Sequence, residues 1–436
     1  MPITPPTTFG DRLIRYTSET FPEIIVRAEG SWVWDKDGRA ILDFTSGQMC
    51  STLGHNHPAV VEAVKSSADQ AIHLFSGMIP DTVVGLAERL ANVLPKPLSK
   101  SMFVNTGGEA NEAALKIAKY ASGGYETVSL GGSWHGAGGS GGAVSMASDR
   151  KGHGPTLPGV YAIPEPNAYR CPVEHCRDSC DFTCMKIGFR MLDMQWAGAP
   201  AAVIAEPILS AGGVIVPPQG YFTALRQECE ARGLMLIFDE AQTAFGRLGQ
   251  WFASDGLGVT PDIMAVSKTL GGGIPLAATI TTDAIEECAY SNGFSHYTSH
   301  VSDPLPAAAG LAVLDTLERE NLLDRAVEMG GYLKDRMVDL QQKYEVIGDV
   351  RGQGLLLGVE LVEDREGRAP YHQLGAMTTE RCLGLGLSMN IRRRPDRGSV
   401  WRIAPPLTVT RDEIDTATAI LDQALSESLD TLVRQN

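Results

Sequence analysis

Two charged residues stand directly after apolar runs that look like buried strands. Residues 234–238 (LMLIF) are followed by Asp239, and residues 263–267 (IMAVS) by Lys268. The strands of an open α/β sheet bring their carboxyl ends to one edge, where ligands bind. One helical crossover fits between Asp239 and Lys268, so both side chains could reach one pocket. Because a buried lysine is costly unless it is paired or used, the two residues form either a structural ion pair or a reactive site.

A lysine beside a carboxylate suits an enzyme that uses pyridoxal 5′-phosphate (PLP). This cofactor needs a lysine for its imine and a carboxylate that keeps its ring nitrogen protonated. Its phosphate needs backbone N–H donors at the start of a helix, and Thr106, Gly107 and Gly108 open a helical pattern after a strand-like run. A turn or a helix C-cap would use the same glycines. Trp134 could stack on a flat ring, although a tryptophan alone is more often a core residue.

Arg402 is a single arginine inside the apolar stretch 400–407 (VWRIAPPL). An isolated buried guanidinium needs an anion, and a substrate carboxylate is its natural bidentate partner. A structural salt bridge is the competing interpretation. The residues alone leave these two interpretations open.

Size and composition restrict the class of protein. The chain has 436 residues, 43% of them hydrophobic, and a net charge of −15, which argues against nucleic acid or an anionic membrane as its partner. The N-terminus lacks the apolar core of a secretory signal, and the apolar runs are too short to span a bilayer. Eight cysteines without such a signal are expected to be reduced thiols. We therefore expect a cytoplasmic protein that binds small molecules.

The order of patterns predicts an α/β fold with a mostly parallel sheet covered by helices. Short apolar runs alternate with helical patterns over much of the chain, as in sheets that are buried on both faces. We expect three parts: an N-terminal segment, 1–47, that contributes to the small domain, a large PLP-binding domain, 48–315, and a small C-terminal α/β domain, 316–436. A strand pair is expected within 31–44, and helices are expected from residues 322 and 411.

Several phrases together resemble the class III aminotransferase family over nearly the whole chain. They are 38-GRAILDFTSGQMCSTLGHNHP, 105-NTGGEANEAA, 133-SWHG, 205-AEPILSAGG, 238-FDEAQTAFGRLG, 266-VSKTLGGGIPLAA and 400-VWRIAPPLT. The resemblance implies PLP fold type I, the aspartate aminotransferase fold, and a homodimer or a dimer of dimers. Within the family, 44-FTSGQM, 74-LFSGM, 298-TSHVSDPLP and 387-LSMNI resemble the branch of 2,2-dialkylglycine decarboxylases.

The resemblance implies a set of PLP-binding residues. Lys268 would be the Schiff-base lysine and proton shuttle, Asp239 would pair with the ring nitrogen, and Gln242 would bond the ring hydroxyl. The remaining cofactor residues would hold the phosphate or lie against the ring: Thr106, Gly107, Gly108, Trp134, His135, Glu206 and Ser299 of the partner subunit.

The resemblance also implies how the substrate is held. Gln48 would bind the carboxylate that is lost, and Arg402 a carboxylate that is kept, so Lys268, Gln48, Trp134 and Arg402 form the expected catalytic set. The expected substrate pocket consists of Gln48, Met49, Ala137, Ala211, Asn390 and Arg402. Ala137 and Ala211 stand where the decarboxylase branch has methionine and serine, which predicts a larger pocket.

These roles imply a decarboxylating transaminase for α,α-disubstituted amino acids. It would release CO2 and a ketone and use a 2-oxo acid such as pyruvate as the amino acceptor. The alternatives are an ordinary class III aminotransferase that keeps Gln48 without using it, and a simple PLP decarboxylase that releases an amine. A PLP-binding regulator is disfavoured because Lys268, Asp239 and Arg402 are all present.

Two possible metal sites remain. The resemblance implies an alkali cation, K+ or Na+, at mostly oxygen donors from Leu74, Ser76, Ser299, Val301 and Asp303. Separately, a cysteine-rich segment has a spacing close to that of zinc sites, with three thiols that would share one helical face; its members are Cys171, His175, Cys176, Cys180 and Cys184. Because the spacing differs from the C-x2-C of zinc ribbons, free thiols in a surface insertion are favoured over a bound metal.

Overall fold

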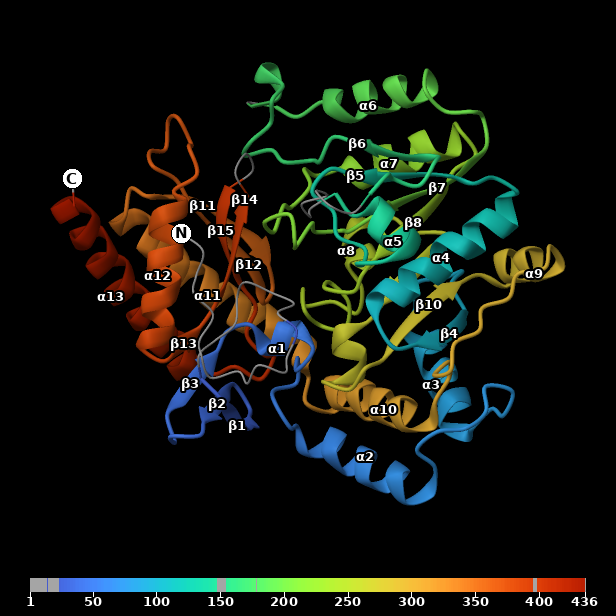
Figure 1. Ribbon diagram of the computed structural model, residues 1–436, viewed down its shortest axis with the longest axis horizontal. Helices are drawn as coiled ribbons and strands as arrows, with labels where there is room; N and C mark the ends of the chain where they lie inside the picture. Colours follow the sequence, from blue (N-terminus) through green and yellow to red (C-terminus); the bar gives the residue numbers. More distant parts are fainter. Residues whose placement is uncertain (1–13, 15–22, 147–153, 178, 395–397, 436) are drawn as a thin grey trace.

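A seven-stranded sheet forms the centre of the larger part of the molecule (Figure 1). The computed structural model describes residues 14, 23–146, 154–177, 179–394 and 398–435. In spatial order the strands are β4 (Lys100–Val104), β10 (Ala277–Thr281), β9 (Ile263–Val266), β8 (Met235–Asp239), β7 (Pro200–Ala205), β5 (Glu126–Leu130) and β6 (Val160–Ile163). The pairs from β9 to β6 are parallel, whereas β10 runs antiparallel to both β9 and β4. The expected mostly parallel sheet is confirmed.

Helices cover both faces of this sheet, which explains why its strands are continuously apolar. Alternate residues of β7 point to opposite faces: Ile204 packs with Leu115 of α4, whereas Val203 packs with Phe222 of α7. The helices of the larger part are α2 (Pro58–Gln70), α3 (Asp81–Val93), α4 (Gly107–Ser122), α5 (Gly139–Val144), α6 (Thr183–Asp193), α7 (Tyr221–Glu230), α8 (Ala253–Leu257), α9 (Asp283–Ser291) and α10 (Pro304–Arg319).

Two four-stranded sheets and three long helices form the rest of the molecule (Figure 1). One sheet has the order β1 (Ile25–Glu29), β2 (Trp32–Asp35), β3 (Ala40–Asp43) and β13 (Leu387–Ser388). The other has the order β11 (Ile347–Gln353), β12 (Leu356–Leu361), β15 (Gly398–Ile403) and β14 (Asn390–Arg394). The helices are α11 (Leu322–Lys343), α12 (His372–Gly384) and α13 (Arg411–Gln435).

The elements expected near both ends of the chain are therefore present. The strand pair within 31–44 is β2 and β3, and helices begin at Leu322 and Arg411. Strand β3 pairs in parallel with β13, so the N-terminal and C-terminal regions share a sheet. Among the described residues, no helix has both the length and the apolar character needed to cross a membrane.

The cysteine-rich segment does not form the single helix that would align its thiols. Cys176 lies in a short 3-10 helix, η1 (Glu174–Arg177), whereas Cys184 lies in the first turn of α6. The residue before α6, Phe182, has a left-handed backbone with φ of 61°, a conformation that a continuous right-handed helix excludes. The expectation that Cys176, Cys180 and Cys184 share one helical face is therefore wrong.

A buried arginine joins segments that lie far apart in the chain. Arg247 follows β8 and is fully buried, and one guanidinium nitrogen donates to the backbone carbonyls of Leu355 and Pro405. The other nitrogen lies 3.1 Å from Ser46 Oγ and 3.3 Å from Thr52 Oγ1. Burial lowers the pKa of Arg247 to about 9, which still leaves it charged at neutral pH. One side chain from the central region thus satisfies four acceptors in the N-terminal and C-terminal regions.

We expect Arg247→Met to lower the free energy of unfolding by at least about 3 kcal/mol, because it leaves several buried acceptors without a donor. The control is Arg319→Met, which removes an exposed side chain and should change stability by less than about 1 kcal/mol. The measurement is urea unfolding of the full chain with PLP present. Equal effects from the two substitutions would contradict the proposed role of Arg247.

Candidate active site

The start of α4 provides a backbone cradle at the carboxyl end of β4. Thr106 caps the helix, and it forms a capping box with Glu109. A Cβ at Gly107 would lie 2.8 Å from Ser267 Oγ, and one at Gly108 would lie 3.4 Å from Gly136 Cα. The helix start therefore approaches the end of β9 as closely as only glycine permits. Its free N–H groups and the helix dipole favour an anion such as phosphate.

Asp239 ends β8 as a buried carboxylate with fixed partners. Its Oδ2 atom lies 2.7 Å from Asn111 Nδ2 and 2.9 Å from His135 Nδ1, and its Oδ1 accepts from the backbone N–H of Ala241. Burial raises the pKa of Asp239, but the bond from His135 and the nearby positive charge of Lys268 outweigh it, so the net shift is downward. Asp239 is therefore held in its anionic form.

Lys268 follows β9 and opens the 3-10 helix η2 (Lys268–Gly271), with a left-handed φ of 49°. Its ammonium interacts electrostatically with Asp239, Glu206, Cys50 and Arg402, which places these groups around one site. Burial lowers the pKa of Lys268, while Asp239 opposes this shift. A lowered pKa makes the neutral amine more accessible than in an exposed lysine, and the neutral amine can act as a nucleophile or a base.

Glu206 holds two loops beside this site. Its carboxylate accepts the backbone N–H of Trp134 at 2.8 Å and that of Ser210 at 3.1 Å. Burial raises the pKa of Glu206 to about 7. Trp134 itself is 36% exposed, so its ring has a free surface although its backbone is anchored. Glu206 acts by positioning Trp134.

Arg402 is buried on β15 and approaches two neutral side chains. One of its guanidinium nitrogens lies 3.3 Å from Gln242 Oε1 and 3.4 Å from Ser210 Oγ. Asn390 is its partner across the β14–β15 ladder, and the buried Oδ1 of Asn390 has no hydrogen-bond donor among the described residues. Arg402, Asn390 and Ser210 thus bring polar groups to one place, as recognition of a carboxylate requires.

Gln48 lies in a strained turn, α1 (Ser46–Met49). Its four residues all have left-handed φ angles: 42° at Ser46, 55° at Gly47, 62° at Gln48 and 64° at Met49. Asp43 stabilises the turn by accepting the backbone N–H of Gly47 at 2.8 Å. Left-handed backbone costs roughly 1–2 kcal/mol per non-glycine residue. Such strain often accompanies a functional position. Gln48 is exposed, whereas Met49 packs into the core.

The two alanines predicted to enlarge the pocket lie in neighbouring loops. Ala137 is exposed in the loop that follows Trp134, and Ala211 is buried next to Ser210. The loops touch, because a Cβ at Gly212 would lie 2.6 Å from the carbonyl oxygen of Gly132.

The expected alkali-cation region contains two histidines that the sequence analysis did not include. Asp303 is buried, with its Oδ1 2.7 Å from His73 Nδ1 and its Oδ2 2.7 Å from His300 Nδ1. Both histidines adjoin predicted ligands in the chain, His73 next to Leu74 and His300 next to Ser299. A cation bound here would compete with His73 and His300 for the carboxylate of Asp303. The alkali-cation site stays a prediction.

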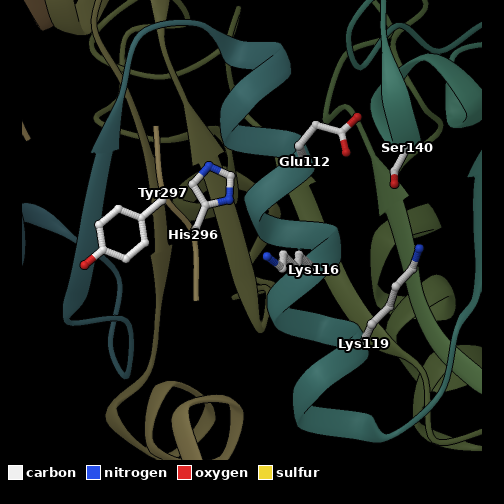
Figure 2. Close-up of a pocket in the computed structure, with 6 residues that line it drawn as sticks. All are labelled: Glu112, Lys116, Lys119, Ser140, His296 and Tyr297. Atoms are coloured by element: carbon white, nitrogen blue, oxygen red, sulfur yellow. The ribbon is translucent and has the colours of Figure 1, made fainter. Parts of the chain in front are cut away.

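A hollow on the outer side of α4 lies next to the Trp134 loop. Figure 2 shows it between the helix, residues 296–297 and Ser140. Glu112 accepts the backbone N–H of Gly141 at 2.6 Å, so α4 supports the loop that carries Trp134 and His135. No motif in the sequence marks this contact between Glu112 and Gly141. Asn111 could have been found, because it lies four positions after Gly107 on the same helical face.

The residues present fit PLP. A partly exposed lysine and a buried carboxylate interact electrostatically, and close to them a helix start leaves space only for glycine at position 107. Trp134, Arg402 and Gln242 complete the expected set. The structure thus brings the predicted cofactor residues of this chain together, and Ser299 of the partner subunit remains a prediction.

Known proteins resemble this chain along nearly its full length. An uncharacterised aminotransferase of Schizosaccharomyces pombe is 46% identical, with 97% of this chain and 95% of that protein covered. A leucine/methionine racemase of Thermococcus litoralis is 34% identical, with 93% and 91% covered. An amine transaminase from an uncultivated Pseudomonas species, solved in its PLP-bound form, superposes with a TM-score of 0.85 at 32% identity, with 97% and 98% covered.

Residues 14–425 match the family described as aminotransferase class-III. That range includes both ends of the site, from the Gln48 turn to Arg402. Solved neighbours of similar size, such as a Bacillus anthracis aminotransferase with a TM-score of 0.88 at 29% identity over 93% of each chain, share the fold. The chain therefore belongs to the PLP-dependent class III aminotransferase family.

Proposed function

We propose that the protein is a decarboxylating transaminase for α,α-disubstituted amino acids. It releases CO2 and a ketone, and a 2-oxo acid such as pyruvate accepts the amino group. The main support is the strained turn that presents Gln48, in which Ser46, Gly47, Gln48 and Met49 all have left-handed φ angles. Because the adjacent Cys50 interacts electrostatically with Lys268, the turn borders the site of the reactive lysine.

Asp239 and Lys268 have different roles in the proposed reaction at the α-carbon. When bound, PLP withdraws electrons from a bond at the amino acid's α-carbon. Asp239, held anionic by His135 and Asn111, keeps a proton on the ring nitrogen. The Nζ atom of Lys268 takes or returns a proton at the α-carbon, because its lowered pKa makes the neutral amine accessible.

Gln48 and Arg402 each hold a carboxylate, and the difference in their charge favours loss of CO2 at Gln48. A carboxylate loses its charge as it becomes CO2, so a full positive charge beside it would stabilise the ground state more than the transition state. The neutral amide of Gln48 can orient a carboxylate without that penalty. Arg402, a permanent cation, is suited to a carboxylate that keeps its charge.

An ordinary amino acid transaminase is the second candidate. It is favoured by Arg402, whose guanidinium faces the neutral Gln242 and Ser210 and could receive one carboxylate. It is also supported by the names of two relatives, an uncharacterised aminotransferase and a leucine/methionine racemase, because neither name describes a decarboxylase. In this case Gln48 would be present without a role in bond cleavage. Release of CO2 distinguishes the two candidates.

We also propose that the enzyme is a cytoplasmic homodimer or dimer of dimers, with K+ or Na+ near Asp303. Ser299 is exposed in the single chain, which leaves its hydroxyl accessible to a phosphate held by another subunit. Sedimentation that shows an active species of 46.7 kDa would contradict the dimer.

Lys268→Ala should abolish the covalent PLP–lysine adduct that borohydride reduces, because the substitution removes the buried amine. Lys100→Ala, which removes an exposed lysine, should leave the adduct intact. Mass spectrometry of the reduced peptides is the measurement. A labelled lysine that persists in Lys268→Ala would show that another residue carries the cofactor.

Gln48→Ala should reduce CO2 release from 2-aminoisobutyrate by roughly 10²-fold or more. Transamination of L-alanine should change by less than about threefold, because its carboxylate would lie on Arg402. Gln423→Ala, at an exposed position on α13, is the matched control. Trapped CO2 and the pyruvate formed are measured in parallel.

Three results of that assay would contradict the decarboxylating transaminase. Equal losses in both reactions would remove the special role of Gln48. A wild type that releases no CO2 from any disubstituted substrate, yet transaminates L-alanine, is an ordinary aminotransferase. Release of an amine in place of a ketone would identify a simple decarboxylase.

Ala137→Met should shift preference toward 2-aminoisobutyrate and away from bulkier dialkylglycines. Filling the space beside Ala137 in the wild type could contribute up to about 2–3 kcal/mol of binding free energy for a larger substituent. The measurement is kcat/KM for both substrates in both proteins. If the wild type prefers 2-aminoisobutyrate and Ala137→Met has no effect, the pocket is not enlarged.

A further inference from the structure

The cysteine-rich segment joins the two parts of the molecule. It leaves β6, passes over the top of the view in Figure 1 and returns to the larger part at α6. On the way, Arg170 forms an ion pair with the buried carboxylate of Glu360 on β12. Arg368 donates a hydrogen bond to the carbonyl of Tyr169. Whatever stabilises this segment therefore also stabilises the contact between the two parts.

Three metal-binding groups of different chemistry converge within this segment. One ligand atom each from His175, Cys176 and Asp181 lies within 4.8 Å of the others. His175 Nε2 is 3.2 Å from Asp181 Oδ2, and the thiol of Cys176 is 3.2 Å from Asp181 Oδ1. Cys176 is buried, although both of its neighbours in the cluster are exposed. An imidazole, a thiol and a carboxylate thus already face a common point.

Further thiols surround these three groups. Cys171 interacts electrostatically with both Cys176 and Cys184, and Cys180 also interacts with Cys184. Zinc binds cysteine as the thiolate, so these thiols are ligands of the type that the cluster needs to complete its coordination. None of the PLP, substrate or alkali-cation roles proposed above uses this cluster. Its three ligand groups meet in the folded chain although the sequence lacks the C-x2-C spacing of zinc ribbons.

We propose that His175, Cys176 and Asp181, with Cys171 as the fourth ligand, bind one Zn2+ ion. Zinc accepts nitrogen, sulfur and carboxylate ligands in a tetrahedral arrangement, whereas Mg2+ and Ca2+ prefer oxygen. With four protein ligands the site is closed and structural. Binding releases the thiol protons of Cys176 and Cys171 and replaces the hydrogen bond from Cys176 to Asp181. The ion stabilises the segment between β6 and α6 and has no part in the chemistry at Lys268.

The stoichiometry of bound zinc tests this proposal. The full-length protein with PLP is stripped with a chelator, loaded with Zn2+, dialysed and analysed for metal by mass spectrometry. We expect about one tightly held zinc ion per chain in the wild type. Cys176→Ser and His175→Ala should both lose it, and His175 is exposed, so its replacement should not disturb folding. Cys288→Ser, at an exposed cysteine on α9, should keep the ion.

Two further measurements separate a structural zinc site from weak surface binding. The wild type loaded with Co2+ should show the intense visible bands of tetrahedral thiolate coordination. Limited proteolysis should cut residues 165–182 faster in the zinc-free protein, while the borohydride-reducible PLP adduct stays unchanged. The PLP adduct is measured independently of zinc. A protein that forms the adduct but holds no zinc would contradict the zinc site and leave the proposed function standing.

Three results would overturn the zinc site. The first is a wild type that holds no zinc after dialysis. The second is equal zinc in the wild type, Cys176→Ser and His175→Ala. The third is zinc that is kept in His175→Ala but lost in Cys180→Ser and Cys184→Ser, which would assign the ion to a different set of ligands.

Discussion

The whole active site depends on burying opposite charges at the carboxyl edge of the central sheet. Asp239 is buried and Lys268 is only partly exposed, and neither charge is tolerable there without compensation. Asp239 is compensated by His135 and Asn111. Because Asn111 belongs to α4 and His135 to the loop after β5, this one carboxylate requires that the helix start, the loop and the end of β8 meet. The helix start that we expect to hold a phosphate and the carboxylate that we expect to pair with a ring nitrogen therefore form together.

A second buried charge connects that edge to the rest of the molecule. Arg247 bonds Ser46 and Thr52 on one side and the carbonyls of Leu355 and Pro405 on the other. Ser46 begins the left-handed turn that carries Gln48, and Pro405 lies three residues after Arg402. The first residue of the turn, Ser46, accepts a hydrogen bond from Arg247. Loss of that bond would leave part of a buried guanidinium without an acceptor, and this cost helps to hold the strained turn in place. The positions of the Gln48 and Arg402 segments are thus linked through one side chain.

The sequence predicted the parts of this arrangement that follow from local pattern. The runs at 234–238 and 263–266 are apolar because both faces of their strands are covered, so Asp239 and Lys268 could be assigned to strand ends. Thr106 to Gly108 were recognisable because the capping chemistry is local. The contacts of Arg247, the pairing of Gln242 with Arg402, and the approach of His73 and His300 to Asp303 were not predictable. Each joins single polar residues that are distant in sequence, and no periodicity marks such pairs. The helical alignment of the cysteines failed for a related reason, since one left-handed residue, Phe182, redirects the chain.

The burial of opposite charges at the carboxyl edge of the sheet also explains how one fold serves several reactions. Chains similar to this one carry the names of aminotransferases and of a racemase, and all of these reactions begin by weakening a bond at the α-carbon. Asp239 and Lys268 suit the step that these reactions have in common, the weakening of a bond at the α-carbon. Neither residue determines which of the bonds at that carbon breaks. The choice depends on which group holds the carboxylate and whether that group is charged. In this chain Arg247 links the segment of a guanidinium, Arg402, to the segment of an amide, Gln48. Under the function we propose, the substrate's second substituent then decides which of the two holds the carboxylate. In that proposal an amino acid with a hydrogen at Cα places its carboxylate on Arg402, whereas a disubstituted one gains reactivity only by placing its carboxylate on Gln48.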